Sequence, residues 1–211
     1  MADFINTIDA LGDAVVMDSI INRTITEFKD DKIETVGQYA FANCTALETV
    51  VLPNVKTLGV YAFSISGGVT ITTFELPSVT SIAKGALGFS GRKKVNRMVF
   101  PKLTYLAAWQ ANFLTCDCLD FHILGNIPNN TFVDCSIKSL ILRKTDGICT
   151  NGGTGNYFNL GVDDFHIYVP AALKTQYMEA TNWSTYADQF RALEDYTVDG
   201  TTTGELDETK I

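Results

Sequence analysis

Apolar residues recur with a fixed period through the first half of the chain. Three dipeptides, Leu52-Pro53, Leu76-Pro77 and Phe100-Pro101, place their prolines 24 residues apart twice in succession. Four further sets of positions are apolar in all three copies: Leu47, Ile71 and Val95; Val50, Phe74 and Met98; Val55, Val79 and Leu103; and Leu58, Ile82 and Leu106. Such a period is typical of a repeat protein, in which each unit buries its apolar side against its neighbours.

Looser copies flank these three units. Upstream, Ile33, Val36 and Phe41 repeat the spacing of Val55, Leu58 and Phe63. Downstream, further units begin near Leu119, Ile137 and Phe165, and the regularity declines after Gly125. We therefore expect about six units over residues 33–169.

Alternation within each unit predicts one short strand. Val50 and Leu52 point inward and Thr49 and Val51 outward, and proline follows the strand, where its missing N–H costs least. In the unit around residue 120 we shift the register by one, which assigns Phe121 and Ile123 to the core. The outward positions form a candidate binding row: Thr73, Glu75, Arg97, Val99, Asp120, His122, Ile141, His166 and Tyr168. Each alone is an ordinary sheet residue, but together they predict an extended partner surface.

The two ends depart from the repeat. Residues 1–32 fit an N-terminal cap or attachment segment, because a solenoid needs atypical end units. Pro170 is placed to begin a helix, and residues 170–196 are predicted to be a helical C-terminal cap, with a second short helix over about 185–193. The polar, acidic residues 197–211 are expected to form a flexible tail. The glycine-rich segment 147–161 is interpreted as a loop, since it lacks the ending of a phosphate-binding loop.

The run Val-Gly-Gln-Tyr-Ala-Phe-Ala-Asn-Cys-Thr-Ala-Leu-Glu-Thr-Val-Val-Leu-Pro-Asn-Val, residues 36–55, resembles the BspA-like (Treponema-type) leucine-rich repeat. The C-terminal run from Ile167, with Asn182-Trp183-Ser184 after it, is similar to the usual ending of such proteins. The resemblance implies a leucine-rich-repeat solenoid, an α/β repeat with one short parallel strand per unit. It further implies adhesion or protein binding without catalytic residues, on bacterial surfaces or in phage- and prophage-encoded proteins.

Charge and hydropathy exclude several classes of function. The formal net charge of −8 opposes binding to nucleic acid, and the cluster Arg92-Lys93-Lys94 with Arg97 is interpreted as a solvated loop. No apolar run approaches the length of a membrane helix. The N-terminus has no basic region followed by an apolar stretch, so no secretory signal is predicted.

Candidate chemistry is sparse. The five cysteines are odd in number and irregular in spacing, which favours buried thiols over a disulfide framework. Cys116, Cys118, His122 and Cys135 are the one candidate metal set, but alternation on a strand would place them on two faces. No nucleophile motif or paired carboxylates stand out, so we predict no enzyme, no metal and no cofactor.

The function predicted is therefore recognition of a protein or cell-surface ligand through the outward row. Exposed Val51, Val99 and Ile141 with Tyr168 would make a partly apolar strip, which favours a protein partner or self-association. A carbohydrate partner would call for an aromatic platform, and Tyr168 alone qualifies in this row. The alternative is a structural or decoration protein attached to a larger assembly through its ends.

Overall fold

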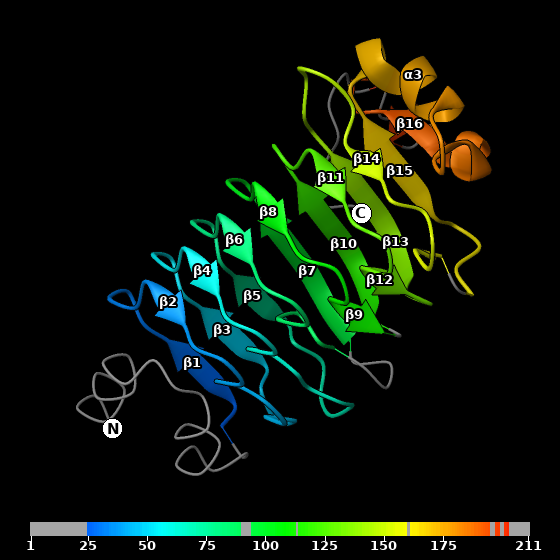
Figure 1. The fold of residues 1–211 in the computed structure, drawn as a ribbon. Helices are drawn as coiled ribbons and strands as arrows, with labels where there is room; N and C mark the ends of the chain where they lie inside the picture. The colour runs from blue at the N-terminus through cyan, green and yellow to red at the C-terminus, as the bar shows by residue number, and fades with distance from the viewer. Residues whose placement is uncertain are drawn as a thin grey trace.

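The computed structural model describes residues 25–89, 94–112, 114–159, 161–194, 197–198 and 201–202. The chain winds into a β-solenoid of about seven turns with parallel strands, which confirms the predicted repeat fold (Figure 1). Residues paired between neighbouring coils are 22 positions apart from β1 to β3 and 24 from β3 to β5, but 21 from β7 to β10. The spacing therefore varies from coil to coil around the 24 residues of the central copies, and it reaches 27 residues from β13 to β15.

One side of the solenoid carries what we call the main strand row. A three-stranded sheet in the order β1-β3-β5 is followed by a five-stranded sheet in the order β7-β10-β13-β15-β16, and all pairs are parallel. The strands are β1 (Glu27–Lys29), β3 (Thr49–Val51), β5 (Thr73–Glu75), β7 (Lys94–Phe100), β10 (Thr115–Phe121), β13 (Ser136–Leu142), β15 (His166–Val169) and β16 (Phe190–Ala192).

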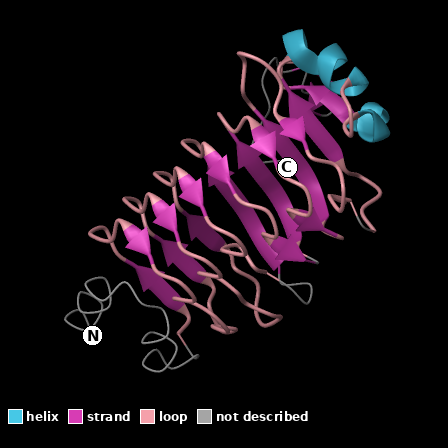
Figure 2. Cartoon of the chain, in the orientation of Figure 1, coloured by secondary structure: helices cyan, strands magenta, loops and turns pink. Residues whose placement is uncertain are grey.

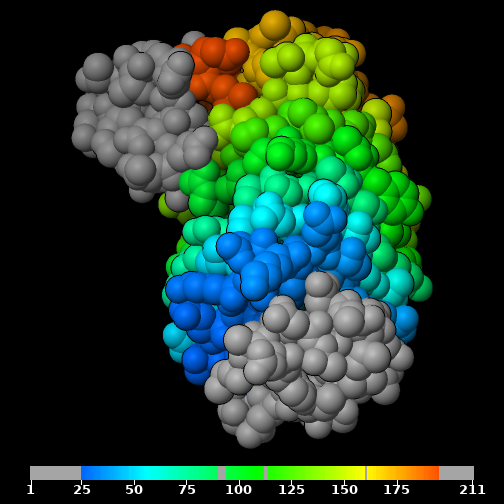
Figure 3. All heavy atoms as spheres, turned by 90° about the vertical axis from the view of Figure 1, so that its left-hand side faces the viewer, coloured from blue at the N-terminus to red at the C-terminus, as the bar shows by residue number. Residues whose placement is uncertain are grey.

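Two-residue strands line the opposite side of each coil. They are β2 (Thr35–Val36), β4 (Thr57–Leu58), β6 (Ser81–Ile82) and β8 (Tyr105–Leu106) in one sheet, then β11 (Asn126–Ile127) with β14 (Thr150–Asn151). A further pair joins β9 (Ala111–Asn112) to β12 (Phe132–Val133). In the part of the chain that the structure describes, Figure 2 shows strands along its length and helices at its C-terminal end. In the view of Figure 3 the coils follow one another in chain order from blue to orange.

The seven-residue strands do not alternate strictly. In β7, Val95 and Met98 are both buried, and the two residues between them are only partly so. In β10 and β13 two core positions are likewise three residues apart and the regular pairing skips one residue, but there Cys118 and Ser139 between them are buried as well. Phe121 lies in the core as predicted. Ile123 does not: its side chain is 47% exposed, because the strand ends at Phe121 and the chain turns before Ile123 reaches the core.

A file of aromatic rings runs through the core. Phe41 stacks on Phe63 with centroids 4.8 Å apart, and Phe28 packs edge-on against Phe41. Later coils continue the file with Phe100, Phe121, Phe132, Phe158 and Trp183. Since the rings of each series cover one another, removal of apolar surface from water is shared between coils from Phe28 to Phe89 and again from Phe100 to Trp183.

The C-terminal cap is only partly helical. It contains the 3₁₀ helix η1 (Ala171–Leu173), the helix α3 (Lys174–Glu179) and the 3₁₀ helix η2 (Ser184–Gln189). The second helix expected to reach about residue 193 is wrong in its latter part, because Phe190–Ala192 joins the main strand row as β16.

The other boundaries also need correction or lie outside the described residues. The first coil begins with β1 at Glu27, inside the segment 1–32 that was expected to precede the repeats, and residues 1–24 lie outside the described part. In the expected flexible tail, β17 (Thr197–Val198) and β18 (Thr201–Thr202) form an antiparallel pair, and residues 203–211 lie outside it. The segment 147–161 is built into the stack, since Asn156 is buried and bonded to Pro128, Thr131 and Asn151.

Candidate functional site

The main strand row is interrupted between β5 and β7. Among the described residues no ladder of hydrogen bonds pairs these two strands, and an isolated bridge joins Ile71, which precedes β5, to Val95 of β7. There the Ile71 N–H donates to the Lys94 carbonyl at 2.9 Å, and the Asn96 N–H donates to the Ile71 carbonyl at 3.0 Å. At this point the row changes from three-residue strands to seven-residue strands, and the sheet splits in two.

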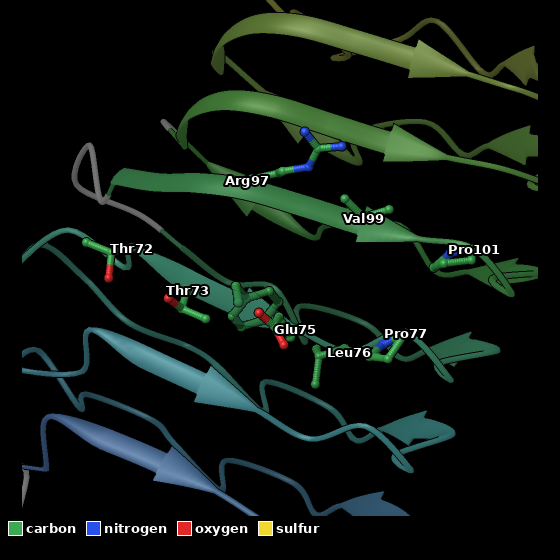
Figure 4. Close-up of a pocket in the computed structure, with 9 residues that line it drawn as sticks. Thr72, Thr73, Glu75, Leu76, Pro77, Arg97, Val99 and Pro101 are labelled. Carbon is green, nitrogen blue, oxygen red and sulfur yellow. The ribbon is translucent and has the colours of Figure 1, made fainter. Parts of the chain in front are cut away.

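A hollow of about 420 Å³ lies over this interruption on the outward face. We call it the seam hollow; Figure 4 shows the side chains from both strands around it. It is lined by Thr72, Thr73, Phe74, Glu75, Leu76, Pro77, Arg97, Val99 and Pro101. The structure thus brings together four residues of the predicted binding row: Thr73 and Glu75 from β5, and Arg97 and Val99 from β7.

The seam hollow combines an apolar lining with charge of both signs. Phe74 and Leu76 are almost fully buried, and Val99 lies at intermediate exposure. Glu75 is exposed on one strand, and Arg97 is partly exposed on the next. Such a site suits an apolar side chain whose neighbours carry polar or charged groups, as at the edge of a protein–protein interface.

Three residues of the predicted row are not exposed. Asp120 has no accessible surface, Ile141 none, and Tyr168 only 7%. The expectation that they face solvent is wrong, since alternation sets the direction of a side chain but not what covers it.

The cover comes partly from neighbouring outward positions. Asp120 lies between Val99 and Ile141 in register, and Arg143 donates to both of its oxygens, with Nε at 3.0 Å and Nη2 at 2.9 Å. Cys118, Ile141 and Tyr168 form a small apolar cluster with Leu193 packed against it. The outward face over β10, β13 and β15 is therefore an additional layer of packing rather than an open surface.

The two histidines of the row lie apart from the seam hollow. His122 follows β10, with Nε2 3.6 Å from the Asp120 carboxylate. His166 begins β15, with Nδ1 3.4 Å from the Asp164 carboxylate. Burial and the nearby Arg191 guanidinium lower the pKa of His166, while Asp164 opposes this shift.

The cysteines lie inside the protein. All five are buried and free of disulfides. Cys116 belongs to the main core and Cys118 to the outward cluster, so the strand separates the two thiols of the candidate metal set onto different faces. Within the described ranges no group of three or more His, Cys, Asp or Glu side chains is placed to hold a metal ion.

The described helices also bear on the class of protein. None of them has both the length and the apolar character needed to cross a bilayer.

Sequence reasoning missed about half of the seam hollow. Phe74 and Leu76 were interpreted as core residues and Pro77 and Pro101 only as strand ends, and Thr72 had no predicted role. The repeated Leu-Pro and Phe-Pro dipeptides were the available signal, because equivalent prolines on adjacent coils must lie side by side.

Stacked parallel coils with a consensus apolar file define a leucine-rich-repeat solenoid. Residues 18–138, more than half of the chain, match the model of the BspA type leucine-rich repeat region in six copies. The chain belongs to this family, whose repeats typically bind proteins and are generally non-catalytic. No functionally curated protein matches the chain significantly.

Proposed function

We propose that the chain is a recognition module that binds a protein partner on the outward face of the main strand row, centred on the seam hollow. The main support for this proposal is the split between β5 and β7, where the seam hollow of about 420 Å³ lies. Family membership supports the class of partner, since leucine-rich repeats typically bind proteins.

The residues around the hollow supply the two things that a protein interface needs. Val99, Pro77 and Pro101, which are at least partly exposed, offer apolar surface that a partner's side chain removes from water. Glu75 and Arg97 place opposite charges on neighbouring strands, which selects the orientation of the partner more than it adds affinity. The complementary segment is an apolar side chain flanked by a basic and an acidic residue.

The part of the outward face that is accessible to a partner is smaller than the sequence predicts. Thr49 and Val51 of β3 are partly exposed and continue it toward the N-terminal end. On the other side it ends where Cys118, Asp120 and Ile141 are buried. Recognition is therefore assigned to Thr73, Glu75, Arg97 and Val99, with Thr49 and Val51 beside them, and not to Asp120, Ile141 or Tyr168.

Site-specific photo-crosslinking tests this assignment. A benzophenone amino acid is placed at Thr73, and in a matched control at Ser81, which is equally half-buried but lies on the opposite strand row. Irradiation in the native cells should yield a discrete cross-linked protein from position 73 and not from position 81. Glu75→Lys and Arg97→Glu should abolish it, whereas Glu34→Lys should not. Equal products from both positions, or products that survive both charge reversals, would overturn the assignment.

A more specific form of this proposal is that the chain serves in adhesion to a cell or is placed on a virion. It is supported by the family's adhesive members and by the net charge of −8, which keeps a surface protein from adhering to acidic polymers. Quantitative mass spectrometry of purified particles and surface fractions measures how much of the wild-type and Glu75→Lys chains is incorporated. The attachment of the same particles then distinguishes the two roles. Recognition predicts normal incorporation and lost attachment for Glu75→Lys. A decoration protein, the alternative, predicts incorporation with attachment unaffected.

A further inference from the structure

A second surface is formed by the turns that follow β4, β6 and β8. Tyr61, Gly85 and Trp109 occupy equivalent places in these turns, with φ of 55°, 64° and 63°, and Tyr39 has φ of 58° in the coil before. The Tyr39 N–H donates to the Val60 carbonyl at 3.0 Å, so the turns stack directly on one another. We call Tyr39, Tyr61, Gly85 and Trp109 the turn row.

The turn row carries aromatic rings at three of its four positions. Tyr39 and Tyr61 stack with centroids 5.3 Å apart and planes 12° apart. Gly85 follows without a side chain and is buried, because the Tyr61 ring lies over it and would overlap a Cβ there. Trp109 comes next, with 50% of its surface exposed, so its indole is the open aromatic surface of the row.

A hollow of about 380 Å³ lies in this surface. It is lined by Tyr61 and Ser64 of one turn, by Lys84, Gly85 and Gly88 of the next, and by Trp109 and Gln110 of the third. The volume falls within the roughly 300–1,000 Å³ of small-molecule sites.

Gln110 holds the base of this hollow in a fixed shape. Its side chain is buried and its amide donates to the carbonyls of Ala107 at 2.6 Å and Ala83 at 3.0 Å. Its oxygen accepts from the Leu87 N–H at 3.3 Å. Because one side chain ties the turn after β6 to the turn after β8, the part of the hollow beside Trp109 is set before any ligand binds, which lowers the entropy cost of binding.

We propose that this hollow binds a pyranose ring of a glycan, packed on the exposed Trp109 ring and bordered by Tyr61. The C–H face of a sugar carries a slight positive charge and packs on the negative face of an aromatic ring. The exposed Lys84 ammonium and the Ser64 hydroxyl border the same hollow and supply hydrogen bonds to ring hydroxyls. Lys84 also disfavours a cationic ligand, which a pair of aromatic rings would otherwise attract, and it favours a sugar that carries a carboxylate.

The position of this platform differs from the sequence expectation. Tyr168, the aromatic residue singled out there, is buried. The turn row lies at a different part of each coil from the seam hollow, and no residue lines both. The proposed site for a protein partner on the outward face and the proposed sugar site at the turns are therefore separate. An experiment can contradict one of these two proposals and leave the other standing.

The chain provides its own spectroscopic reporter. It has two tryptophans, Trp109 and Trp183, and Trp183 has no accessible surface. Saturation-transfer NMR and tryptophan fluorescence with soluble hexaoses (of glucose, N-acetylglucosamine, mannose and galacturonate) test the site directly. A bound sugar should protect Trp109 from acrylamide quenching and saturate with rising concentration.

Variants distinguish binding in this hollow from binding to exposed aromatic side chains in general. Trp109→Ala and Tyr61→Ala should each weaken binding about tenfold, near the upper value of one aromatic contact. Tyr105→Ala removes an aromatic side chain that is 59% exposed on β8 and should change nothing. Lys84→Glu should weaken the galacturonate hexaose more than the neutral ones. Absence of saturable binding below about 10 mM, unchanged binding by Trp109→Ala, or binding of a tyrosine-containing dipeptide instead of every sugar would each overturn the proposal.

Discussion

The indole Nε1 of Trp183 donates a hydrogen bond of 2.7 Å to the backbone carbonyl of Cys149, 34 residues earlier in the chain. The Tyr177 hydroxyl accepts from the N–H of the same residue at 2.7 Å. Both aromatic side chains are buried, and Trp183 stacks on Phe158 at the end of the core file. The cap therefore provides hydrogen-bond partners for the backbone N–H and carbonyl of Cys149, and it also covers the apolar end of the last coil. A solenoid terminus needs both.

Replacement of Trp183 by phenylalanine should destabilise the chain by about 2–4 kcal/mol, because the buried Cys149 carbonyl loses its donor and a cavity remains. Urea unfolding followed by circular dichroism measures the change. Trp109→Phe is the matched control, and it should stay within about 0.5 kcal/mol because that side chain is half exposed. Equal effects of both substitutions would contradict the assigned role of the cap.

The buried Asp120–Arg143 pair gives a second prediction. Arg143→Met should cost about 3–5 kcal/mol, since it leaves a carboxylate without accessible surface and without its bidentate partner. Adding Asp120→Val, which extends the apolar layer of Val99 and Ile141, should restore most of that loss. Lys56→Met, which breaks the exposed pair with Glu34, is the control and should have an effect below about 1 kcal/mol. A double variant less stable than Arg143→Met would refute this account.

His166 should make the folded chain less stable in mild acid. Burial and Arg191 lower its pKa in the folded state, so the unfolded chain binds a proton more readily. Its contribution to stability is therefore lost as the pH falls below the unfolded value of about 6.5 toward the lowered folded pKa. Urea midpoints at pH 7.5 and 5.0 should differ less for His166→Gln than for the wild type. An identical pH dependence would show that His166 carries none of it.

The thiols should be inert in the folded protein. All five cysteines are buried, and burial raises the pKa of Cys149 to about 12 and that of Cys116 well above its ordinary value. Because the thiolate is the reactive form, a disulfide reagent such as Ellman's at pH 8 should titrate none of them quickly in buffer and all five in guanidinium chloride. Rapid reaction of one thiol in the native chain would mean that its coil opens locally.

Much of this fold could be read from the residues alone. The in-step apolar positions, such as Val50, Phe74 and Met98, all lie in the core, because a side chain that repeats once per coil must stack on its equivalent. The same rule predicted the parallel pairing of Thr49 with Thr73, which the structure confirms. The period of the pattern determined the architecture before any tertiary contact was known.

What lies over the outward positions was decided only by the tertiary structure. Glu75 and Asp120 are equivalent in the pattern, yet Glu75 is exposed beside a hollow and Asp120 is sealed under Arg143. Alternation fixes a direction relative to the backbone, whereas exposure depends on residues that are distant in the chain. The split between β5 and β7 and the packing of the Tyr61 ring over Gly85 are likewise relations between coils. The local sequence determined which residues stack, and the three-dimensional arrangement decided where the stack leaves room for a partner.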